Sequence, residues 1–135
     1  MGKYTYYDPE ENVIFCDPTG LSASKENIDL ISDEVEEVAR SILPRKVFMV
    51  VCYKEIKMTP ELVAYYGERM AATQKHLRGV VRYAMEDIVT RIALRSETVK
   101  YGLQKGQAHI YSSKEEALAA VWQMERAGEG KTTDK

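Results

Sequence analysis

Cysteine and histidine are scarce in this chain of 135 residues, which has two of each. Cys16 and Cys52 form no C-x-x-C pair, and both lie in apolar runs that favour strands. Free cysteines in such runs commonly act as small buried hydrophobes, so we expect inert, reduced thiols. His76 and His109 are isolated from any Asp, Cys or Ser arrangement that reads as a triad or a metal site. We therefore expect neither a bound metal nor nucleophilic catalysis.

The chain also has no long apolar run and no excess of basic charge. No segment approaches the roughly 18 apolar residues that a membrane-spanning helix needs, and the N-terminus, MGKYTYYDPEEN, lacks the apolar core of a secretory signal. The formal net charge is −2, whereas general nucleic-acid binders usually carry a marked basic excess. P-loop and G-x-G-x-x-G motifs are absent. We expect a cytosolic protein without membrane insertion, nucleic-acid binding or a cofactor.

What the sequence does contain is a regular alternation of strand and helix patterns. Runs of β-favouring residues predict strands at 3–7, 13–17, 46–53, 78–84 and 108–111. The run VFMVVCY does not alternate, which is typical of a strand that is buried on both faces. Most segments between the strands repeat apolar residues at spacings of three and four, which predicts helices with one inner face. The expected inner residues are Ile28, Ile31, Val35, Val38 and Ile42; Leu62, Val63, Tyr66 and Met70; Ile88, Ile92 and Val99; and Leu118, Val121 and Trp122.

The resulting order, ββαβαβαβα, predicts an α/β fold. Strands that alternate with helices favour a mostly parallel sheet with right-handed crossovers, and the first two strands favour an antiparallel hairpin. We expect a single-domain α/β sandwich at 1–127, with a mixed, mostly parallel sheet. Gly102 and Gly106 are expected to end the third helix. The polar tail, 128–135, is expected to be disordered.

The stretch Thr59-Pro60-Glu61 follows the central strand and has three features of a helix start. They are a capping hydroxyl, proline at the first helical position and an acid in the first turn. A capping bond is a sufficient reason for Thr59. The alternative is that Thr59 is a phosphorylation site, because a phosphate is tolerated near the positive end of a helix.

The third helix has an arginine within its apolar stripe. Arg95 falls among Ile88, Ile92 and Val99 on a helical wheel, and Arg91 lies one turn before it. An arginine in such a place pairs with an acid, extends to the rim or lines a cavity, because a bare buried charge is very costly. Either Arg95 is a paired or rim-exposed residue, or it is a cationic group at the mouth of a pocket for an anionic head group.

Four segments together resemble the SpoIIAA-like proteins of the STAS fold, named after sulfate transporters and anti-sigma-factor antagonists. They are the N-terminal hairpin, the acidic first helix, the VFMVVCY strand and the closing IYSSKEEALAAVW, and the resemblance covers about residues 4–124. In the antagonist branch, a phospho-acceptor Ser or Thr follows an Asp at the start of the helix after the central strand. The counterpart here is Met58-Thr59, in which Met replaces the Asp. Pro60-Glu61-Leu62 replaces the small Gly-containing stretch.

Three functions follow from these patterns. The first is a non-catalytic regulatory or ligand-binding STAS-like domain, which binds a protein partner or a small apolar or anionic ligand. The second is a phosphorylation-switched anti-sigma-factor antagonist that uses Thr59. The third is a small enzyme with its site at the carboxyl ends of the parallel strands. The sequence leaves the partner or ligand open and is compatible with a homodimer. Candidates for the binding surface are Met58, Tyr66, Arg91 and Arg95, and those for an enzyme site are Cys52, Tyr53, Lys54, Tyr83 and Glu86.

Overall fold

The computed structural model describes residues 3–100 and 110–127, of which 97–100 and 127 are described by their backbone alone. Over the described residues, the strands and helices follow the predicted order ββαβαβαβα, with a short 3-10 helix in addition. The elements are β1 (Thr5–Asp8), β2 (Val13–Cys16), α1 (Lys25–Ser41), β3 (Phe48–Cys52), α2 (Pro60–Thr73), η1 (Gln74–His76), β4 (Gly79–Tyr83), α3 (Ile88–Lys100), β5 (Ile110–Tyr111) and α5 (Lys114–Ala127).

The described strands form one five-stranded sheet in the order β1-β2-β3-β4-β5. β1 pairs with β2 in antiparallel register, with Tyr6 opposite Phe15, and each later pair of neighbours is parallel. The predicted α/β class, the mostly parallel sheet and the N-terminal antiparallel pair are therefore confirmed. The expected helix end at Gly102 and Gly106 and the expected disordered tail, 128–135, lie outside the described residues.

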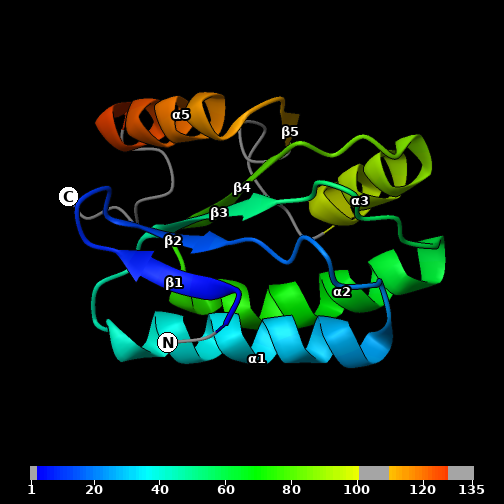
Figure 1. Ribbon diagram of the computed structural model, residues 1–135. Coiled ribbons are helices and arrows are strands. Elements are labelled where there is room, and N and C mark those ends of the chain that lie inside the picture. The colour runs from blue at the N-terminus through cyan, green and yellow to red at the C-terminus, as the bar shows by residue number, and fades with distance from the viewer. Residues whose placement is uncertain (1–2, 101–109, 128–135) are drawn as a thin grey trace.

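Helices cover both faces of the sheet. Figure 1 shows α1 and α2 side by side on one face and α5 across the other. Met49 and Val51 on β3 belong to the core under α1 and α2, whereas Phe48 and Val50 belong to the core under α5. Successive side chains of a strand point to opposite faces, so an apolar run without alternation is what a strand between two cores requires.

Helices α1 and α2 are tied together by a polar network. The Arg69 guanidinium lies 2.7 Å from Asp29 and 2.8 Å from Asp33, and the Tyr65 hydroxyl donates to Asp29 at 2.5 Å. The Asp33 hydrogen bond is the main reason that the pKa of Arg69 is raised. The network lies toward the solvent side of the helix pair, and it orients the two helices whose inner faces cover the sheet.

The predicted inner face of α3 is wrong. Ile88 and Ile92 are 69% and 63% exposed, whereas Thr90 and Leu94 are buried. α3 has apolar residues around much of its circumference, so the period does not single out one face. The side with Leu94 packs into the core beside α2. Thr90 is buried at little cost because its hydroxyl bonds to the backbone of residue 58. The Val99 side chain lies outside the described residues.

The predicted burial of Trp122 on α5 is also wrong. Ala117, Val121 and Met124, at spacings of four and three, take the inner face. Trp122 lies one position after Val121 and is therefore turned away by about a quarter of a revolution, which leaves it 51% exposed. Leu118 is partly buried against the same core, as the spacing predicts.

Candidate ligand-binding site

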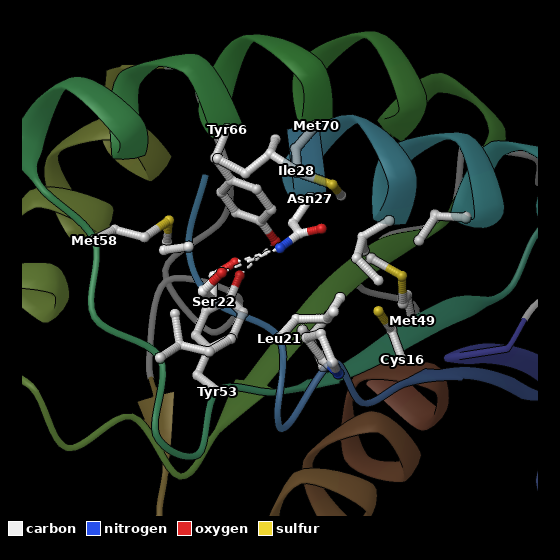
Figure 2. A pocket seen from close by; sticks show the side chains of 16 residues that line it. Cys16, Leu21, Ser22, Asn27, Ile28, Met49, Tyr53, Met58, Tyr66 and Met70 are labelled. Atoms are coloured by element: carbon white, nitrogen blue, oxygen red, sulfur yellow. Dashed lines mark hydrogen bonds between the residues drawn. The ribbon is translucent and has the colours of Figure 1, made fainter. Parts of the chain in front are cut away.

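A cavity opens between the sheet and helices α1 and α2, at the carboxyl ends of β2 and β3 (Figure 2). The cavity has a volume of about 60 Å³. Strands supply Cys16, Met49 and Val51, and the helices supply apolar residues from the inner faces that the sequence pattern predicts. The helical lining residues are Ile28, Ile31, Val35, Tyr66 and Met70.

The loop between β2 and α1 covers one side of the cavity. It contributes Pro18, Leu21 and Ala23 to the lining. A left-handed glycine, Gly20, with a φ of 99°, makes the turn in this loop. The Asn27 amide of α1 donates to the Ser22 carbonyl at 2.8 Å. The polar lining groups of Ser22 and Asn27 are thus bonded to one another, and the loop is held against α1.

The loop between β3 and α2 covers the other side, with Ile56 and Met58 in the lining. Its end is anchored by α3, because the Met58 N–H donates to the buried Thr90 hydroxyl at 2.7 Å. That hydroxyl lies 2.7 Å from Asp87 and donates to it. Asp87 also accepts from the Thr90 N–H at 3.0 Å. These hydrogen bonds lower the pKa of Asp87, so the anchor keeps a charged acceptor.

Apart from Ser22 and Asn27, the polar groups at the cavity belong to a pair of tyrosines that a buried arginine contacts. The Tyr53 and Tyr66 hydroxyls lie 2.5 Å apart, and the Arg82 Nε–H donates to Tyr53 at 3.4 Å. All three side chains are buried, Arg82 at 4% exposure. Burial raises the pKa of Tyr53 and raises that of Tyr66 well above its ordinary value of 10.0. Both tyrosines are therefore neutral hydroxyls at neutral pH.

The structure brings together two of the four predicted binding residues. Met58 and Tyr66 both line the cavity, one from the loop and one from α2. Arg91 and Arg95 do not line it, and both are exposed on α3. The interpretation of Arg95 as a cationic group at the mouth of a pocket rested on the buried face of α3 that the structure contradicts. As contacts for a partner, the two arginines stay a prediction.

Their surroundings on α3 are apolar. Val89 is 58% exposed beside the exposed Ile88 and Ile92. Contiguous exposed apolar residues are typical of surfaces that bind a partner or are covered by another segment.

The residues proposed for an enzyme site are not gathered at the cavity. Tyr53 lines it, but Cys52 and Tyr83 are not part of the lining, and Lys54 and Glu86 are exposed. The Cys52 thiol lies 3.8 Å from the Thr19 hydroxyl. Both cysteines are free and buried, as expected from the sequence. Within the described part of the chain, no group of three His, Cys, Asp or Glu side chains is placed to hold a metal ion.

Sequence reasoning missed Arg82 and Thr90. A signal for Arg82 was present, because VVRYA places one charge within an apolar strand, and such a charge needs a buried partner. Thr90 gave no signal, because its role depends on a backbone N–H that is 32 residues away in the sequence.

Thr59 lies at the edge of this region as an exposed helix cap. Its hydroxyl accepts a hydrogen bond from the Leu62 N–H at 3.2 Å, which confirms the predicted cap. Its phosphorylation stays a prediction.

We expect Thr59→Ala to lower the free energy of unfolding by about 1 kcal/mol, because the Leu62 N–H loses its acceptor. Urea denaturation followed by circular dichroism measures the change. Thr59→Ser keeps the capping oxygen and is the matched control, with an expected loss well below that of the alanine variant. Equal stability of the wild type and Thr59→Ala would contradict the cap.

No protein-family model, curated protein or solved structure matches the chain. The likeness to the SpoIIAA-like proteins therefore stays a prediction from the sequence. Separately, none of the described helices is long and apolar enough to span a membrane.

Proposed function

We propose that the protein is a non-catalytic binding domain of the STAS type that takes up a small apolar ligand between its sheet and helices α1 and α2. The observation that carries the proposal is the cavity itself, which lies between the sheet and helices α1 and α2 and reaches the carboxyl ends of β2 and β3. Its walls are apolar apart from the tyrosine pair and the mutually bonded Ser22 and Asn27. Such walls favour apolar ligands.

The size of the cavity limits the ligand. At about 60 Å³, the cavity is smaller than the roughly 150 Å³ cavity that binds benzene in an engineered protein. A ligand of ring size must therefore extend through the mouth of the cavity or displace side chains. Met49, Met58 and Met70 line the cavity, and unbranched methionine side chains re-orient readily. The lining thus adapts to a ring-sized guest at low cost.

Titration with toluene tests the proposal directly. We expect two-dimensional ¹H–¹⁵N spectra to show concentration-dependent shifts at cavity residues such as Val51, Met58 and Met70. Val51→Ile adds one methyl group on the cavity side of β3, so it should weaken toluene binding several-fold. Val50→Ile adds the same group on the opposite face of the same strand, where it cannot reach the cavity, so toluene affinity should stay at the wild-type value.

Two results would overturn the proposal. One is an absence of shifts at cavity residues up to the solubility limit of toluene. The other is equal binding by Val51→Ile and Val50→Ile, which would place the toluene elsewhere on the protein.

A further inference from the structure

The tyrosine pair at the cavity has one hydrogen more than it can use. Tyr53 and Tyr66 each carry one O–H, and the single hydrogen bond between them consumes only one of these hydrogens. Arg82 adds a third hydrogen to the cluster by donating to the Tyr53 oxygen. Whichever tyrosine donates to the other, one hydroxyl hydrogen is left over. Among the described residues, no acceptor lies within hydrogen-bonding distance of either hydroxyl to receive it.

That donor lies at the cavity. Both tyrosines are part of the lining, and Figure 2 shows Tyr66 reaching from α2 toward Tyr53, which comes from the strand side. A buried donor without an acceptor costs about 1–3 kcal/mol. An oxygen atom on a bound molecule would remove this cost while the rest of that molecule contacts apolar walls.

Water is a poor occupant of this position. An ordered buried water typically needs two to four polar partners. The tyrosine pair offers one free O–H and the unused lone pairs of its two oxygens, and at the other polar part of the lining the Asn27 amide already donates to Ser22. A molecule with a single oxygen and an apolar body matches the site better than water does.

The oxygen is best uncharged. A carboxylate in this cavity would lose its hydration shell and gain only one hydroxyl donor. Burial of a charge with so little compensation is strongly disfavoured. A carbonyl oxygen is satisfied by one or two donors. Arg82 donates to the Tyr53 oxygen and does not itself line the cavity. Its charge polarises the two hydroxyls, which makes the free O–H a stronger donor.

We propose that the ligand is a small apolar carbonyl compound whose oxygen accepts the spare hydrogen of the Tyr53–Tyr66 pair. This inference rests on the proposed function, because it specifies the chemistry of a ligand in the same cavity. It explains why two large hydroxyl-bearing side chains converge on a wall that is otherwise apolar.

Isotope-edited infrared spectroscopy of the wild-type protein with [¹³C=O]cyclohexanone tests the inference. We expect the carbonyl band of the bound probe to lie below its position in an alkane solvent, as it does when the oxygen accepts a hydrogen bond. Methylenecyclohexane has the same shape without the oxygen, and it is the matched ligand for affinity measurements by NMR titration.

Variants locate the donor. We expect the double substitution Tyr53→Phe/Tyr66→Phe to lower the preference for cyclohexanone over methylenecyclohexane about five- to tenfold, and to return the carbonyl band to its alkane position. Each single substitution leaves one hydroxyl and should have a smaller effect. Tyr65→Phe, which removes a hydroxyl on α2 that is bonded to Asp29 and does not line the cavity, should leave the preference unchanged.

The outcomes separate the two proposals. If neither probe shifts cavity resonances, the proposed function fails. If both probes bind there but the carbonyl band of the wild-type complex lies at its alkane position, the cavity binds apolar molecules and the carbonyl inference is overturned. The infrared result on the wild type is decisive even where the double variant does not fold.

Discussion

The free energy of unfolding is expected to fall steeply as the pH rises above about 10. The reason is the burial of weakly acidic groups. Cys16, Tyr53 and Tyr66 are buried, and burial also raises the pKa of Tyr83. Burial raises the pKa of Cys16 from 9.0 to about 12 and raises those of Tyr53 and Tyr66 above 10.0. Between the unfolded and folded values, the unfolded chain loses protons that the folded protein keeps. The stabilisation is therefore complete below about pH 9 and is lost as the pH rises.

The expected size of the effect follows from linkage. Each such group contributes a slope of about 1.4 kcal/mol per pH unit between its unfolded and folded pKa values. Several such groups together can remove a large share of the roughly 5–15 kcal/mol that is typical of a domain.

Urea denaturation at a series of pH values between 8 and 11 measures this slope. Tyr66→Phe removes one of these groups, so we expect its slope above pH 10 to be smaller than that of the wild type by about 1.4 kcal/mol per pH unit. Tyr6→Phe, at an exposed position on β1, is the matched control and should retain the wild-type slope. A free energy of unfolding that stays constant from pH 8 to pH 11 would show that these groups are not buried as described.

Leu94→Ala is expected to lower the free energy of unfolding by about 2–5 kcal/mol. Leu94 is 2% exposed and belongs to the core under α1 and α2. Truncation removes its apolar contacts and leaves a void between α3 and that core. The same change at Ile92, which is 63% exposed, should alter stability by less than about 0.5 kcal/mol, as is usual for surface positions.

This pair of variants discriminates between two faces of one helix. The helical spacing of Ile88, Ile92 and Val99 predicts that Ile92 is the inner residue, whereas the structure buries Leu94. The two variants differ by two positions in the same helix, so changes in helix propensity largely cancel. Chemical denaturation of both variants measures the difference. A larger loss in the free energy of unfolding for Ile92→Ala than for Leu94→Ala would show that the face predicted from the sequence is the buried one.

The two α3 variants also bear on the binding surface. If Ile92→Ala leaves stability and toluene affinity unchanged, the exposed residues of α3 are free to serve a partner independently of the cavity. Thr90 connects the two regions, because it bonds the Met58 backbone from the buried side of α3.

Local signals in the sequence determined the elements of this fold. The Ser24 and Thr59 hydroxyls each accept a hydrogen bond from the N–H of the residue three positions later in the chain. The residues that define these helix starts therefore lie within one helical turn. The run of β3 lies between two cores, and its lack of alternation shows this directly. The order of elements then implies the parallel sheet, because a strand–helix–strand unit has one common handedness.

Tertiary structure alone decided the site. Tyr53 and Tyr66 are 13 residues apart, and Arg82 is 29 residues from Tyr53, so no local pattern connects them. The sequence likewise did not determine which face of α3 is buried, because apolar residues lie around much of the helix. What selected Thr90 and Leu94 was the position of the Met58 backbone and of the core beside α2. Local patterns report which residues can be buried, whereas the neighbours that bury them are known only once the chain is folded.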